Sequence, residues 1–120
     1  MSPWQGSGAG QAIEDAMILE HLLQDTKKSC DLNKVLTIYD EFRRPRSQRI
    51  VHSSAHTGRI LCGKEPGVGL EPDKIRKALG PMWECIYQID FKEYKTEALA
   101  QFRKLKEESE IPLRLLKISQ

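Results

Sequence analysis

Glycine residues cluster near the start of the chain, immediately before a segment in which apolar residues recur at helical spacing. The stretch SPWQGSGAGQAIEDA places Gly6, Gly8 and Gly10 at alternate positions. The first amides of a helix have no acceptor within the helix, and together with the helix dipole they attract carbonyl groups and anions. Because glycine has no side chain, the backbone can approach a flat ligand closely. The spacing is neither GxGxxG nor a P-loop, so a ligand site and helix packing by small residues are both open interpretations.

Histidines and cysteines are the other candidates for metal or nucleophile chemistry. His52 and His56 are four residues apart, which can place both on one helical face, but no third ligand is evident. Cys30, Cys62 and Cys85 lack CxxC spacing, and no His/Asp arrangement accompanies any of them. We therefore predict no metal site and no catalytic residue in this chain. Reduced thiols and the lack of a secretory signal predict a cytoplasmic protein.

Charge is nearly balanced, with 19 Lys and Arg against 17 Asp and Glu and a net charge of +2. The main basic cluster is formed by Arg43, Arg44, Arg46 and Arg49. Such a cluster is typical of a solvated face, or of arginines paired with acids such as Asp40. We predict no nucleic-acid partner, because no wider basic surface is evident. We predict no membrane segment either, because the apolar runs are far too short.

Helical spacing of apolar residues extends through nearly the whole chain, and no convincing strand pattern appears. Asp31 is a candidate N-cap for a second helix, which Pro45 either kinks or divides. GKEPGVG at 63–69 is a loop, MWECIYQI at 82–89 favours helix over strand, and Asp90 can cap a last helix. The sequence therefore predicts a mostly α fold. The expected core-facing residues are Ala12, Ile13, Ala16, Leu19, Leu22 and Leu23, then Val35, Ile38, Tyr39 and Phe42, then Phe91, Tyr94, Ala98, Phe102 and Leu105.

Three longer stretches are more specific than the glycines alone: SPWQGSGAGQAIEDA, YDEFRRPRSQRIVHSSAHTGRIL and WECIYQIDFKEYKTEAL. They resemble the C-terminal flavin-binding motif, the helix after it and the segment before the last helix of the FAD-dependent aromatic hydroxylases, the salicylate-hydroxylase-like flavoprotein monooxygenases. The resemblance covers residues 1–102. It implies the helical C-terminal part of an α/β FAD-binding monooxygenase fold that lacks the N-terminal dinucleotide-binding unit. The implied single segment, 1–120, comprises a flavin loop and helix at 1–24, a long kinked helix at 31–61 and C-terminal helices at 72–108.

The resemblance also implies a reaction in which NAD(P)H reduces bound FAD, and the reduced flavin uses dioxygen to hydroxylate an aromatic small molecule. Such a site must stabilise negative charge on the N1–C2=O edge of reduced flavin, which fixed amides at a helix N-terminus can do. Carried over by position, Gly8–Gly10 offer these amides, Gly6 lets the loop turn, and Pro3 lies against the flavin edge near the substrate. The cofactor-binding residues so implied are Pro3, Gly6, Gly8, Ala9 and Gly10, flanked by Trp4 and Gln5.

Two further motifs of that family, GxGxxG and GD, do not occur in these 120 residues. We therefore expect a truncated FAD-dependent monooxygenase that contributes the flavin-ring loop and helix N-terminus, is inactive alone and binds FAD poorly by itself. One alternative is a non-catalytic helical interaction protein whose partner is an N-terminal flavoprotein half or another chain. Another is an independent helical bundle with no role in flavin binding.

Overall fold

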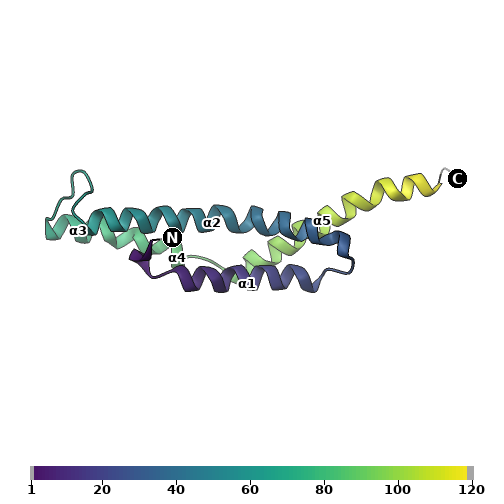
Figure 1. Ribbon diagram of the computed structural model, residues 1–120, viewed down its shortest axis with the longest axis horizontal. Helices are drawn as coiled ribbons and strands as arrows, with labels where there is room; N and C mark the ends of the chain where they lie inside the picture. Colours follow the sequence, from purple (N-terminus) through teal and green to yellow (C-terminus); the bar gives the residue numbers. More distant parts are fainter. Residues whose placement is uncertain (1, 119–120) are drawn as a thin grey trace. The chain divides into compact units, whose positions relative to one another are not determined.

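Helices make up most of the chain in the computed structural model (Figure 1), which describes the backbone of residues 2–118 and the side chains of residues 2–109. No strand occurs in the described backbone, so the predicted mostly α fold is confirmed. None of the described helices is long and apolar enough to cross a membrane. The elements are η1 (Pro3–Gln5), α1 (Gly8–Gln24), η2 (Ser29–Asp31), α2 (Leu32–Leu61), α3 (Pro72–Leu79), η3 (Gly80–Trp83), α4 (Glu84–Tyr87) and α5 (Phe91–Ile118), where η denotes a 3-10 helix.

Local signals in the sequence account for several helix ends. The Asp90 carboxylate accepts hydrogen bonds from the N–H groups of Lys92 and Glu93, at 2.9 and 3.0 Å, and so caps α5 as predicted. Pro72 stands at the start of α3, where its missing N–H costs nothing. Residues 82–87 fold as the end of η3 and the single turn of α4, and residues 88 and 89 follow without regular structure, so helix was the correct choice over strand for most of this segment.

The second long helix runs through Pro45, so this proline does not begin a new helix. Proline cannot donate to the carbonyl four residues earlier, which weakens the helix locally. The chain divides close to this point into two compact units. The first unit is Met1–Ile13 with Arg44–Ile89, and the second unit is Glu14–Arg43 with Asp90–Gln120. Helices α1 and α2 each contribute to both units.

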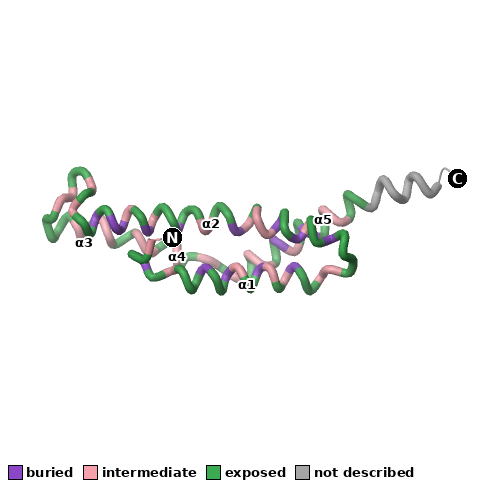
Figure 2. Tube along the Cα trace, in the orientation of Figure 1, coloured by how far each residue is buried: buried purple, intermediate pink, exposed green. Residues whose placement is uncertain are grey.

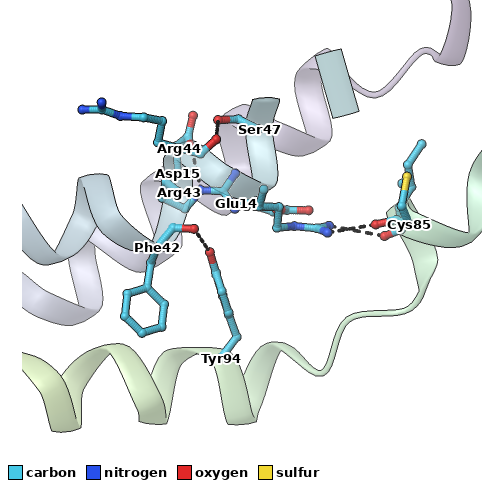
Figure 3. A network of polar contacts seen from close by, with 10 residues as sticks. Glu14, Asp15, Phe42, Arg43, Arg44, Ser47, Cys85 and Tyr94 are labelled. Atoms are coloured by element: carbon cyan, nitrogen blue, oxygen red, sulfur yellow. Dashed lines mark hydrogen bonds and ion pairs between the residues drawn. The ribbon is translucent and has the colours of Figure 1, made fainter. Parts of the chain in front are cut away.

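The second unit is built on an apolar core to which α1, α2 and α5 contribute, and its buried positions recur along each helix (Figure 2). The half-buried rings of Phe42 and Tyr94 pack beside this core with centroids 5.4 Å apart. The Tyr94 hydroxyl also donates a hydrogen bond to the Phe42 carbonyl (Figure 3). The apolar stripe predicted for the second helix therefore faces this core, and so does the stripe of the last helix except for Phe91. The fully or nearly buried members are Ile18, Leu22, Val35, Ile38, Ala98 and Phe102.

The buried face of α1 differs from the predicted one. Glu14 and Ile18 are buried, whereas Ile13 is 61% exposed and Leu23 is 41% exposed. The reason is an ion pair: the Glu14 carboxylate lies 2.8 Å from the guanidinium of Arg43 on α2. This pairing turns a charged position inward and leaves part of the apolar side of the helix outside. Apolar periodicity alone assigns charged residues to solvent and cannot anticipate such a pair.

Polar residues occupy much of the buried face of α2 in the first unit. Ser54 and Thr57 are completely buried there, alongside Ile50 and Ile60. Buried hydroxyl groups need hydrogen-bond partners. In this unit the hydroxyl groups of α2 meet residues that precede α1, so the face of α2 supports the glycine-containing segment.

Candidate functional site

The loop before α1 makes a sharp turn at Gly6. Its φ of 63° lies in the left-handed region that favours glycine, and its N–H donates to the Pro3 carbonyl at 3.0 Å. Helix α1 then begins at Gly8, and the N–H of Gln11 donates to the Ser7 carbonyl at 2.9 Å. The N–H groups of Gly8–Gly10 lie before this bond. No earlier turn of α1 exists whose carbonyl groups could accept hydrogen bonds from them. The turn therefore exposes a set of backbone donors at the start of a 17-residue helix.

Space and charge at this helix start suit an electron-rich ligand. No described atom outside the local backbone lies within 4 Å of the position that a Cβ would take at Gly6, Gly8 or Gly10. These glycines therefore do not serve close packing in the described part of the chain. The first turn of α1 has no acidic residue, so no side chain of that turn offsets the partial positive charge of the helix end.

The side chain of Gln5 ties the loop to two other segments of the first unit. Gln5 is only 9% exposed, and its Nε2 donates to Ser53 Oγ at 2.8 Å and to the Met82 carbonyl at 2.9 Å. Thr57 Oγ1 lies 3.3 Å from the same nitrogen. Ser53 Oγ also donates to the Met82 carbonyl at 3.2 Å, which closes the network. Gln5 Oε1 is buried and accepts no hydrogen bond from any described residue.

Two further contacts hold the loop on α2. Ser54 Oγ donates to the Ser2 carbonyl at 2.7 Å and accepts from Ser2 Oγ at 3.0 Å. The indole of Trp4 lies directly over Gly58: a Cβ built on Gly58 would stand 2.4 Å from Trp4 Nε1. A separation this short is not tolerated, so the absence of a side chain at position 58 admits the indole. The loop is thus fixed by polar contacts of Ser2 and Gln5 and by one aromatic contact of Trp4.

The supporting residues Ser53, Ser54, Thr57 and Gly58 were not among the predicted site residues. All four lie in HSSAHTG, the stretch that also contains His52 and His56. A signal for them existed, because small and hydroxyl-bearing residues repeat on one face of a long helix otherwise rich in charge. The predicted residues Pro3, Gly6, Gly8, Ala9 and Gly10 are brought together in one exposed turn and helix start.

The histidines have separate surroundings. His56 Nε2 lies 3.2 Å from Glu65, whose carboxylate also accepts from Arg59 Nε at 3.1 Å. Across the described residues, no group of three or more His, Cys, Asp or Glu side chains is placed to hold a metal ion. Cys30, Cys62 and Cys85 are free thiols.

The arginines of the predicted basic cluster have different structural roles. In the second unit, Arg43 is 2% exposed and contacts Glu14 at 2.8 Å and Asp15 at 2.6 Å (Figure 3). Burial opposes the charge on Arg43, but hydrogen bonds to Asp15 and Glu14 outweigh it, so the pKa of Arg43 is raised. In the first unit, Arg46 donates to the Cys85 carbonyl at 2.9 Å. At least these two arginines hold the fold together.

Sequence comparisons now define the class of protein. A salicylate hydroxylase of Pseudomonas putida is 35% identical over 102 residues, covering 84% of this chain and 24% of that protein. The FAD-dependent monooxygenase elcH of Phaeosphaeria nodorum is 35% identical over 99 residues, covering 82% of this chain and 20% of that protein. The 6-methylsalicylate 1-monooxygenase atA of Aspergillus terreus is 30% identical over 101 residues, covering 84% of this chain and 23% of that protein. No family model matches the chain.

These matches identify the chain as part of the FAD-dependent monooxygenases, a class of flavoproteins. Within that class, it belongs to the salicylate-hydroxylase-like family of aromatic hydroxylases, as the three sequence stretches indicated. The chain spans about a quarter or less of the length of these relatives. That share, and the absence of strands from residues 2–118, agree with the helical C-terminal part of the larger monooxygenase fold.

Proposed function

We propose that the turn of residues 3–10 and the start of α1 provide the flavin-ring part of an FAD site. The observation that carries this proposal is the open set of amides at Gly8–Gly10, in a segment related to FAD-dependent monooxygenases. The donor set suits the cofactor, because a flavin ring gains negative charge at its N1–C2=O edge on reduction.

Each residue of the turn has a separate task in this proposal. Bound FAD supplies the redox chemistry. Gly8–Gly10 hold their N–H groups in place before the charge develops, so little reorganisation is needed when it does. Gly6 provides the left-handed turn, and Pro3 forms the edge that faces the aromatic substrate. Gln5 acts through its hydrogen bonds to α2 and is a positioning residue for the turn.

A chimera tests the proposal. Residues 1–102 of this chain replace the aligned segment of the Pseudomonas putida salicylate hydroxylase, and the bound FAD per protein and its reduction potential are measured. The key variant is Gly8→Pro, which deletes one amide N–H at a position where proline fits a helix. Its matched control is Gly8→Ala, which keeps the N–H and adds a methyl group into open space.

The proposal predicts a chimera that retains FAD and a lower reduction potential in Gly8→Pro. Loss of one hydrogen bond to a charged group costs about 1.5–3 kcal/mol, which corresponds to about 30–60 mV for a two-electron couple. Gly8→Ala should stay within about 10 mV of the parent chimera, since it removes no donor. A folded chimera without FAD, or equal potentials in the two variants, would rule out this use of the amides.

We further propose that the chain acts within a complete NAD(P)H-dependent aromatic hydroxylase and binds the remainder of such an enzyme through α1. Ile13, Met17 and Leu23 on α1 stay 61%, 37% and 41% exposed, so this helix keeps uncovered apolar surface. The proposed occupant is an N-terminal flavoprotein portion, either in the same polypeptide or as a separate partner. Coexpression with the unmatched part of the P. putida enzyme should give a stable complex that Met17→Glu abolishes. Recovery of an equally stable complex with Met17→Glu would refute this interface.

A further inference from the structure

Arg46 on α2 holds the end of a short helical segment in the first unit. Its Nη1 donates to the Cys85 carbonyl at 2.9 Å, and its Nη2 donates to the Ile86 carbonyl at 3.4 Å. Both carbonyl groups belong to α4, a single turn of four residues. The last carbonyl groups of a helix have no N–H partner within that helix. Because a guanidinium group carries several N–H donors in one planar fork, Arg46 can satisfy two successive carbonyl groups.

The same segment supplies an acceptor to the glycine turn. Met82 lies three residues before Cys85, and η3 continues directly into α4. The Met82 carbonyl accepts from Gln5 Nε2 at 2.9 Å and from Ser53 Oγ at 3.2 Å. Gln5 directly precedes Gly6, the residue with the left-handed conformation in the turn. The segment therefore connects the turn with a guanidinium group on α2.

Residues 80–87 need support from outside the segment. A helical segment this short is unstable alone, since few backbone hydrogen bonds offset the entropy of ordering it. Arg46 and Ser53 are seven residues apart on α2, so they lie on one face of this helix, two turns from each other. They hold the segment at two points. Loss of Arg46 would release the α4 end and let the Met82 carbonyl move.

We propose that Arg46 is a positioning residue for the flavin turn and acts through the Met82 carbonyl and Gln5. This role rests on the proposed flavin-ring site at residues 3–10 and adds a residue far from it in the sequence. Without Arg46, the Met82 carbonyl no longer stays within reach of Gln5 Nε2, and the turn at Gly6 opens more often. A turn that opens more often holds FAD less tightly.

Hydrogen exchange of the Gly6 N–H, followed by NMR in the whole 120-residue chain without flavin, measures opening of the turn. Arg46→Met keeps an apolar stem and removes the donors, whereas Arg46→Lys keeps a charged donor. The matched control is Arg49→Met, three residues further along α2. Arg49 is exposed and has no hydrogen-bond or ion-pair partner in the described part of the chain. Circular dichroism checks that each variant keeps the helical content of the parent.

Arg46→Met should speed exchange of the Gly6 N–H about tenfold, because the loss of hydrogen bonds from a charged donor has an effect of this order. Arg46→Lys should fall between the parent and Arg46→Met, and Arg49→Met should change the rate less than twofold. In a Gln5→Leu background the turn has already lost its bond to Met82, so Arg46→Met should add less than twofold.

Two results of the exchange experiment would overturn the proposed role. One is an equal effect of Arg46→Met and Arg49→Met. The other is a full tenfold effect of Arg46→Met in the Gln5→Leu background, since Arg46 would then act on general stability and not through Gln5. If Arg46→Met does not fold, the comparison of Arg46→Lys with Arg49→Lys decides between the same outcomes.

The chimera described above connects this result to the cofactor. Its dissociation constant for FAD should rise about tenfold with Arg46→Met and less than twofold with Arg49→Met. Failures of the two proposals are distinguishable. A folded parent chimera without FAD would refute the flavin-ring site, whereas a parent chimera whose FAD affinity is unchanged by Arg46→Met would refute the positioning role alone.

Discussion

Replacement of Arg43 by methionine should strongly destabilise the second unit. The Arg43 side chain is 3% exposed, and its Nη1 lies 2.8 Å from Glu14, whose side chain is only 10% exposed. Methionine keeps much of the apolar stem but leaves the buried carboxylate without the guanidinium. A buried carboxylate that loses its counter-ion is far less stable than one in water.

The size of the effect follows from the burial of the two carboxylates. Breaking a buried pair by removal of one partner costs about 3–5 kcal/mol. The second partner, Asp15, is 40% exposed, so its pair with Arg43 adds at most about 1 kcal/mol. The expected loss in the free energy of unfolding for Arg43→Met is therefore about 3–5 kcal/mol, carried mainly by Glu14.

Urea denaturation of the whole chain, followed by circular dichroism at 222 nm, measures this loss, because the described backbone is mostly helical. The matched control is Arg103→Met in the same unit. Arg103 is 57% exposed in its ion pair with Asp25, so the same substitution there should lower the free energy of unfolding far less than Arg43→Met does.

A double variant identifies the cause of the loss. Glu14→Gln combined with Arg43→Met removes the buried charge and should recover about 2 kcal/mol relative to Arg43→Met alone. Equal losses in Arg43→Met and Arg103→Met, or no recovery in the double variant, would refute the argument from burial.

Three further perturbations test other parts of the fold. Asp90→Ala removes the side-chain acceptor at the start of α5 and should cost about 1 kcal/mol in urea denaturation, whereas Asp90→Asn should retain most of the cap. Gly58→Ala should displace the indole of Trp4; in a Trp83→Phe background the emission should shift to the red and iodide quenching should increase, while an unchanged spectrum would contradict the contact. Asp25 has a lowered pKa, first because of its hydrogen bond with Arg103, so its contribution is present above the usual value of 3.8 and is lost as the pH falls through the lowered value. Asp25→Asn should therefore flatten the acid limb of the stability curve below pH 4, and an unaltered limb would exclude this pair as its source.

Local rules were sufficient for much of the helical structure. Asp90 caps α5 and Pro72 begins α3, because capping and proline geometry depend on neighbours in the chain. Pro45 shows the limit of the same rules. The sequence allowed either a kink or a new helix at this position, and the structure continues α2 through it.

The sequence predicted the glycines of the candidate site but not the residues that support them. The glycines of the turn, Gly6 to Gly10, were evident from their spacing and from the resemblance to flavin hydroxylases. The residues that hold the turn were not, because Gln5 and Ser53 are 48 positions apart. No local pattern of residues predicts a hydrogen bond across that separation, so the role of the hydroxyl groups in HSSAHTG depends on the folded structure.

The sequence by itself determined the mostly helical fold, the exposed glycine turn and the monooxygenase family, since each depends on residue type and short-range order. Tertiary structure decided which side of α1 is buried and what supports the turn. In both cases a buried polar group has a distant partner: the Glu14 carboxylate pairs with Arg43, and Gln5 Nε2 donates to Ser53 and to the Met82 carbonyl. The free energy of burying a polar group depends on that partner, and only the folded chain brings the two together.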